Sequence, residues 1–225
     1  MSAWAIVLAC GKEQEITPGT DIGFLALGDR PVVVHSLQTL QACEQIEGII
    51  LVIKKQRVDN ALQSVRAYGL NKIKNIVAGT GSRISNLKKA ADQLPDSATA
   101  VLVHDASCPF VEQDVATETV KAGKRYGAAV AAVRSADAVK LAETGQKVTK
   151  SLDRNTIWIV QSPQAFKRDV FEKMIKSSGR LVDDESALLE KTRQKIHLVV
   201  SSNTNMKIRT AQDLERAGAM VSLNQ

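Results

Sequence analysis

AWAIVLA (residues 3–9), followed by CGKEQEITPGTDIGFLALGDRPVVVHSL (residues 10–37), is the stretch that decides the fold. The first segment is short and apolar, which is typical of a buried strand. A loop rich in Gly, Thr and Asp follows, and a helix is predicted to begin near Pro31. This strand–loop–helix order presents backbone N–H groups to a phosphate in α/β proteins. Glu13 and Glu15, however, place negative charge where an anion site favours Arg or Lys.

Beyond this stretch, apolar runs of strand length alternate with helical patterns. Strands are expected at 47–55, 71–79, 98–103 and 127–133, and helices at 58–70, 85–94 and 114–126. This alternation predicts an α/β fold with a mostly parallel sheet and helices on both faces. In such sheets ligands bind beyond the carboxyl ends of the strands, so the loops after Ala9, Gly79, Val103 and Val133 are expected to share one rim.

The rest of the chain predicts one further feature, a projecting arm. Residues 137–155 are too polar for the core and are expected to form a β-hairpin around a Glu-Thr-Gly-Gln turn. After it we expect a strand at 156–166, a helix at 167–177, a helix at 183–191 capped by Asp183 or Asp184, a strand at 195–202, and a helix at 210–221 capped by Thr210. We therefore predict a single domain, 1–225, with a β-arm at about 137–155.

Composition excludes several classes of function. Aromatic residues make up only 4% of the 225 residues, which argues against base-stacking platforms for nucleic acid. The net charge of +6 favours acidic partners, but the basic residues are dispersed along the chain. No signal peptide or membrane-spanning run is recognisable, and three cysteines without metal spacing indicate reduced thiols. We therefore expect a cytoplasmic protein that binds neither nucleic acid nor membrane.

Four short motifs carry polar residues to expected strand ends. Asp105, in HDASCP (104–109), could hold a divalent metal or a sugar hydroxyl, or could merely cap the following turn. Arg154 and Lys207 are two cations suited to a phosphorylated ligand, although each could be a surface charge. The turn Gly79-Thr80-Gly81-Ser82-Arg83 allows close approach of a base or ribose, which is weak evidence by itself.

Cys10 and Cys108 both follow strands at the same expected rim. They could lie near His104 and form a redox or metal site, or they could be small residues that fill space.

The order of the motifs resembles one family over essentially the whole chain. AIVLACG, FLALGDRPVVVHSL, a GxxR turn, VLVHDASCPFV, DAVK, DRNTIW, SPQAF, DDESALLE and NMKIRTAQDL follow one another as in the 2-C-methyl-D-erythritol 4-phosphate cytidylyltransferases. The ribitol-phosphate cytidylyltransferases are similar. The resemblance implies a Rossmann-like nucleotidyltransferase fold whose β-arm builds a homodimer. It also implies transfer of CMP from CTP to a polyol phosphate, with Mg²⁺ or another divalent cation present and pyrophosphate released.

The resemblance also assigns roles to individual residues. Ala9, Cys10 and Gly11 would border the cytidine and triphosphate, and Gly79, Thr80, Arg83 and Asn86 would surround the base. Asp105 would face the metal or the substrate hydroxyls. Asp137, Lys140 and Arg154 would line the acceptor side, with Arg154 coming from the partner's arm, and Lys207 would lie by the phosphates undergoing transfer.

The first loop departs from the family pattern Ala-Ala-Gly-x-Gly-x-Arg-Met, then Pro-Lys-Gln. Glu13 stands at the second Gly, Glu15 at the expected Arg and Ile22 at the expected Lys. A unit charge about 5 Å from a phosphate interacts by roughly 3 kcal/mol at an effective dielectric constant near 20. Replacing Arg by Glu therefore costs orders of magnitude in rate, unless Lys12 or Arg30 substitutes.

Other departures change the pocket. Cys108 stands at an expected Arg, Asn86 at a Ser and Ala138 at a Thr. Three hypotheses follow: a working cytidylyltransferase for 2-C-methyl-D-erythritol 4-phosphate, a non-catalytic protein that binds a nucleotide or sugar phosphate, and a cytidylyltransferase for another polyol phosphate such as ribitol 5-phosphate. The lost cations favour the second hypothesis, and the family resemblance favours the first.

Overall fold

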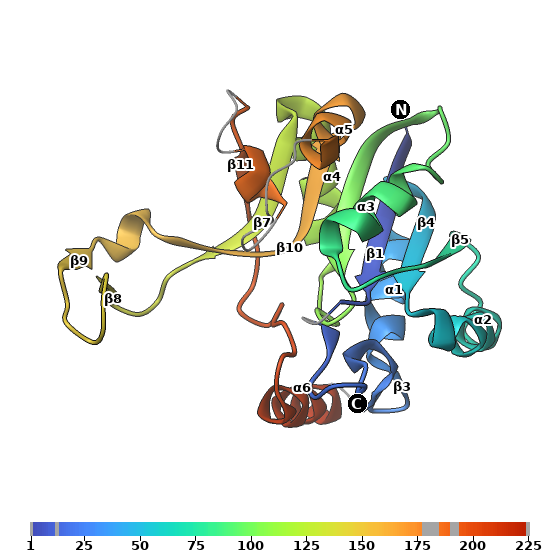
Figure 1. Cartoon of the computed structure of the whole chain (residues 1–225), viewed down its shortest axis with the longest axis horizontal. Helices are drawn as coiled ribbons and strands as arrows, with labels where there is room; N and C mark the ends of the chain where they lie inside the picture. Colours follow the sequence, from blue (N-terminus) through green and yellow to red (C-terminus); the bar gives the residue numbers. More distant parts are fainter. Residues whose placement is uncertain (1, 12–13, 177–184, 190–193, 224–225) are drawn as a thin grey trace.

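The computed structural model describes residues 2–11, 14–176, 185–189 and 194–223. In these ranges a seven-stranded sheet has the order β11-β7-β10-β6-β1-β4-β5 (Figure 1). Its strands are β1 (Ser2–Ala9), β4 (Ile46–Ile53), β5 (Ile73–Ala78), β6 (Ala98–Asp105), β7 (Ala128–Arg134), β10 (Trp158–Lys167) and β11 (His197–Val200). Six of them run parallel and β10 runs antiparallel to both of its neighbours. The prediction of a mostly parallel sheet is confirmed.

Helices cover both faces of this sheet, because its strands are apolar on both sides. The helices are α1 (Val32–Ala42), α2 (Val58–Ala67), α3 (Arg83–Ala91), α4 (Gln113–Tyr126), α5 (Arg168–Lys176) and α6 (Ala211–Leu223). Along β1, Ala5 and Val7 pack in one core with residues of α1, α2 and α4, whereas Ile6 and Leu8 pack in the other with residues of α3 and α5. The apolar run 3–9 is therefore a central strand buried on both faces.

Residues 137–155 leave the body of the molecule as an arm, and the chain returns to the sheet in β10. Its strands β8 (Val139–Leu141) and β9 (Lys150–Leu152) pair antiparallel and form a separate two-stranded sheet. Figure 1 shows this hairpin extending away from the seven-stranded sheet. Leu141 and Val148, on the arm, are 43% and 53% exposed. The predicted hairpin is confirmed.

A small third core joins the two ends of the chain. Ile22, Leu27 and Val32 follow the first loop, and they pack with Ile208 and Ala217 near and on α6. The pair β2 (Ala26–Leu27) and β3 (Arg30–Pro31) forms a short hairpin there. The predicted cap of α6 is confirmed, because Thr210 Oγ1 accepts the backbone N–H of Asp213 at 3.1 Å. Ile22 is fully buried, so this position belongs to the core and not to a charged site.

Most element boundaries fall within a few residues of the expected ones, with two differences. Helix α3 begins at Arg83 rather than at residue 85, because the Ser82 side chain caps it. Only part of the helix expected at 183–191 is described, and Ser186–Leu189 forms a 3-10 helix there. Asp183 and Asp184 lie outside the described residues.

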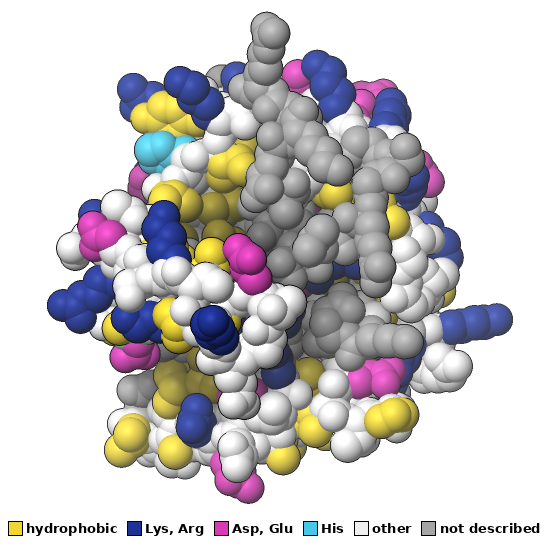
Figure 2. Space-filling model, turned by 60° about the vertical axis from the view of Figure 1, so that its left-hand side comes forward, with side chains coloured by type: hydrophobic (Ala, Val, Ile, Leu, Met, Phe, Trp, Pro, Cys, Tyr) yellow, Lys and Arg dark blue, Asp and Glu magenta, His cyan; other side chains and the backbone are white. Residues whose placement is uncertain are grey.

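The surface carries its basic residues in a scattered pattern. On the face shown in Figure 2, Lys and Arg side chains are interspersed with acidic and hydrophobic ones and do not gather in one stripe. Within the described ranges no helix is long and apolar enough to cross a membrane.

Candidate functional site

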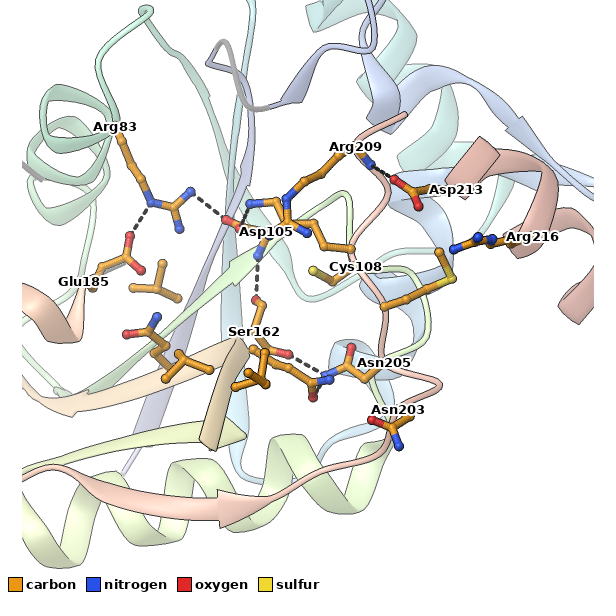
Figure 3. Close-up of a pocket in the computed structure, with 17 residues that line it drawn as sticks. Arg83, Asp105, Cys108, Ser162, Glu185, Asn203, Asn205, Arg209, Asp213 and Arg216 are labelled. Carbon is orange, nitrogen blue, oxygen red and sulfur yellow. Dashed lines mark hydrogen bonds and ion pairs between the residues drawn. The ribbon is translucent and has the colours of Figure 1, made fainter. Parts of the chain in front are cut away.

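A cavity of about 580 Å³ opens at the carboxyl end of β6, between β10 and the segment that leads into α6 (Figure 3). Because the chain alternates strand and helix, the carboxyl ends of β1, β5, β6 and β7 all lie at this edge of the sheet, as predicted. Arg83, Asp105 and Lys207 are the predicted site residues that line the cavity.

Asp105, the last residue of β6, is the centre of the site. Its Oδ2 lies 2.5 Å from Lys207 Nζ, and its Oδ1 lies 2.7 Å from Arg83 Nη1. Burial raises the pKa of this carboxyl, but Arg83 and Lys207 outweigh burial and hold the pKa well below its usual range. Asp105 is therefore an anion that fixes two cations at the cavity wall.

Glu185 completes this network and was not predicted as a site residue. Its Oε1 lies 2.5 Å from Arg83 Nε, and the side chain is 1% exposed. Arg83 thus bridges two carboxylates, Asp105 and Glu185. The sequence signal was present in DDESALLE, where an acidic residue precedes an apolar run, but it indicated a helix start.

A hydrogen-bonded chain behind Asp105 was also missed. The backbone N–H of Asp105 donates to Ser162 Oγ at 2.9 Å, and Ser162 Oγ lies 2.9 Å from His104 Nδ1. His104 Nε2 lies 3.1 Å from the carbonyl oxygen of Cys108, so this nitrogen carries the proton and Nδ1 accepts from Ser162. Ser162 belongs to β10, and only the fold brings it beside β6.

Two acidic residues of the first loop, Glu15 and Asp21, are paired with cations from another part of the chain. Glu15 forms an ion pair with Lys54, and Asp21 lies 2.5 Å from Lys54 Nζ and 2.8 Å from Arg57 Nε. Lys54 and Arg57 follow the carboxyl end of β4, so the acids of the loop are neutralised by the neighbouring strand end. Glu13 lies outside the described residues.

Of the two cations considered as substitutes, only Arg30 is described, and it does not fill the gap. Arg30 pairs with Asp29 at 2.7 Å and donates to Gln38 at 2.6 Å, and it does not line the cavity. Lys12 lies outside the described residues.

The turn expected to surround the base is held by Asn86. Its Oδ1 accepts the backbone N–H of Thr80 at 2.6 Å, and its Nδ2 donates to the Thr80 carbonyl at 3.0 Å and contacts Cys10 Sγ at 3.1 Å. Asn86 is fully buried, so the structure gives it a positioning role for this turn. Gly79 is required because a Cβ there would lie 2.3 Å from Cys10 Sγ.

The remaining predicted residues lie outside the cavity. Ala9 and Cys10 are buried at the end of β1, and Gly11 follows them with φ of 120°. Asp137, Lys140 and Arg154 are exposed on or beside the arm, and none of them lines this chain's own cavity. Lys140 donates to Ser151 and Arg154 to the Ala136 carbonyl, so both are tied to the hairpin.

The cysteines and acidic residues do not form a metal centre in the described structure. Cys10, Cys43 and Cys108 are buried and form no disulfide among the described residues, and burial raises the pKa of Cys108 to about 12. Among the described residues no group of three or more His, Cys, Asp or Glu side chains is placed to hold a metal ion. Both oxygens of Asp105 are engaged with cations. These residues therefore do not fit a resident metal, and a divalent cation would have to enter with the ligand's phosphates.

Comparison with known proteins points to one family. The family described as 2-C-methyl-D-erythritol 4-phosphate cytidylyltransferase matches residues 3–223. The enzyme of that name from Syntrophus aciditrophicus is 31% identical, covering 96% of this chain and 94% of its own, and that from Geobacillus kaustophilus is 30% identical, covering 99% and 98%. The 4-diphosphocytidyl-2C-methyl-D-erythritol synthase of Anaerococcus prevotii superposes with a TM-score of 0.85 at 27% identity, covering 98% and 96% of the two chains.

Proposed function

Because this chain belongs to the 2-C-methyl-D-erythritol 4-phosphate cytidylyltransferase family, we propose that it transfers CMP from CTP to 2-C-methyl-D-erythritol 4-phosphate. An oxygen of the acceptor's phosphate attacks the α-phosphorus of CTP, the bond from that phosphorus to the bridging oxygen breaks, and pyrophosphate leaves. Catalysis of this kind rests on positioning and on neutralising charge on the phosphates.

The observation that carries the proposal is the Lys207–Asp105–Arg83 array at the carboxyl end of β6. Asp105 holds both cations at the cavity, where phosphate groups would meet Nζ of Lys207 and the guanidinium of Arg83. Fixed cations of this kind require no reorganisation when charge develops in the transition state.

The other residues are assigned as follows in the proposal. Backbone groups of Ala9, Cys10, Gly11, Gly79 and Thr80 border the nucleotide, with Asn86 fixing the turn. Mg²⁺ enters bound to the phosphates of CTP. Asp137, Lys140 and Arg154 serve the acceptor in a partner subunit, which requires a homodimer through the arm. The proposal treats residues 1–225 as a single domain and places the protein in the cytoplasm.

The test is pyrophosphate release by the purified protein with Mg²⁺, CTP and 2-C-methyl-D-erythritol 4-phosphate. Lys207→Met is expected to lower kcat/KM by about 100-fold or more, because a fixed charge at the phosphates is worth roughly 3 kcal/mol. Lys195→Met is the matched control, since Lys195 is exposed and does not line the cavity.

Other outcomes decide between the hypotheses. Turnover with ribitol 5-phosphate but not with 2-C-methyl-D-erythritol 4-phosphate would show that the acceptor is the ribitol phosphate. Binding of CTP without turnover under any condition would instead support a non-catalytic binding protein. Equal activity of Lys207→Met and the wild type would overturn the assigned role of Lys207.

A further inference from the structure

The charge balance of the cavity depends on two arginines that the mechanism above does not use. Among the described residues that line it, three side chains are carboxylates and four are cations, so the lining carries one net positive charge. The carboxylates are Asp105, Glu185 and Asp213, and the cations are Arg83, Lys207, Arg209 and Arg216. Without Arg209 and Arg216 the same lining would carry one net negative charge and would repel a phosphate.

These two arginines are also the cations with free hydrogen-bonding capacity. Arg83 and Lys207 are bound to the carboxylates of the site. In the described part of the chain, by contrast, neither the Arg209 nor the Arg216 guanidinium has an ion pair or hydrogen bond. Only the backbone of Arg209 is bonded, through its N–H to Asp213 Oδ2 at 3.0 Å, which anchors the segment and leaves the side chain available.

Their backbone positions are fixed by the third core. Arg209 directly follows Ile208 and Arg216 directly precedes Ala217, and both apolar residues are fully buried in the cluster that also contains Ile22. Ile22 is the position at which the resemblance leads us to expect a lysine. The two arginines are thus held by the same small core that contains Ile22, and both line the cavity (Figure 3).

We propose that Arg209 and Arg216 form an anion clamp for phosphate groups of the ligand, in place of the cations that the first loop lacks. Two guanidinium groups can each bind a phosphate through paired N–H donors, a geometry that a single lysine does not provide. The proposal rests on the proposed function only in requiring a phosphorylated ligand in this cavity. The phosphate bound there belongs either to the nucleotide or to the polyol phosphate.

Calorimetric titration separates these two sources. The probes are CTP with Mg²⁺, inorganic pyrophosphate, and 2-C-methyl-D-erythritol 4-phosphate, each tested on the wild type, Arg209→Gln, Arg216→Gln and the double variant. The matched control is Arg66→Gln. Arg66 is exposed on α2 and does not line the cavity, so this variant removes one positive charge elsewhere on the surface. Each cavity variant is expected to bind its anion about tenfold more weakly, with Arg66→Gln within twofold of the wild type.

The pattern of losses identifies the ligand. Weaker binding of CTP and pyrophosphate alone places the clamp on the nucleotide side, and weaker binding of the polyol phosphate alone places it on the acceptor side. Unchanged affinity for all three probes overturns the clamp, even if the wild type turns over. Arginine-dependent binding of pyrophosphate by a protein without turnover would retain the clamp and reject the proposed reaction.

Discussion

His104 is a neutral side chain whose proton position follows from its two hydrogen bonds. Burial lowers the pKa of His104 to about 4, although Asp105 and the Cys108 carbonyl act in the opposite direction. The neutral ring accepts from Ser162, which in turn accepts the backbone N–H of Asp105. Protonation of His104 would place a second donor against the Ser162 hydroxyl and would disturb the residue that holds Arg83 and Lys207.

This arrangement predicts a loss of stability in mild acid. Because the folded pKa of His104 lies below the unfolded value near 6.5, the unfolded chain binds the extra proton first, and stability falls as pH drops from about 6.5 toward 4. Between pH 7 and 5.5 the wild type should lose about 1 kcal/mol of unfolding free energy through this residue. Urea unfolding at both pH values measures the loss.

The variant His104→Gln is the control for that experiment, since it keeps a neutral polar side chain and removes the titration. Its stability should change by about 1 kcal/mol less than the wild type over the same interval. Identical pH dependence of the two proteins would show that His104 titrates normally.

At the scale of elements, the first loop is fixed to the end of β4 by ion pairs. Asp21 is 5% exposed as a side chain and contacts both Lys54 and Arg57, and Lys54 also binds Glu15. Burial raises the pKa of Asp21, but the hydrogen bonds from Lys54 and Arg57 outweigh it and lower the pKa. Glu15 and Asp21 therefore tie the described part of the loop to Lys54 and Arg57, and these two cations are already paired when a phosphate approaches.

A double-mutant cycle tests this anchoring. Asp21→Asn and Arg57→Gln should show a coupling free energy of about 1 kcal/mol in urea unfolding. This coupling is smaller than that of a fully buried ion pair, because the Arg57 side chain is 36% exposed and solvent screens the interaction. A cycle between Arg57 and Asp59, an acidic residue two positions further along the chain that forms no ion pair with Arg57 among the described residues, should give coupling near zero. Equal coupling free energies in both cycles would mean that the Asp21–Arg57 ion pair adds nothing to stability beyond the long-range attraction between opposite charges.

The elements themselves could be predicted because their signals are local. The run 3–9 is apolar throughout and forms a strand buried on both faces of the sheet, and the polar residues 137–155 form the arm. Ser162 and Glu185 could not be assigned to the site, because their partners lie 58 and 102 residues away in the chain. The pairing of Glu15 with Lys54 spans 39 residues and was equally inaccessible to local patterns.

At the scale of the whole molecule, the arm carries predicted site residues away from the cavity of its own chain. Arg154 is exposed beside the arm and does not line its own chain's cavity. The exposed apolar side chains Leu141, Val148 and Ile159 lie on the arm or next to it. In the homodimer proposed above, a second copy covers these side chains and Arg154 serves the partner's cavity.

Complementation between inactive variants tests this arrangement. Arg154→Ala and Lys207→Ala chains with different affinity tags are coexpressed, and the doubly tagged species is purified. If Arg154 acts in the partner's site, each heterodimer contains one intact site and one doubly defective site, so it should show about half the wild-type activity while either homodimer shows little. If Arg154 acts in its own chain, both sites of the heterodimer are defective and no activity is recovered. Failure to isolate any doubly tagged species, with the wild type sedimenting as a monomer, would contradict the dimer itself.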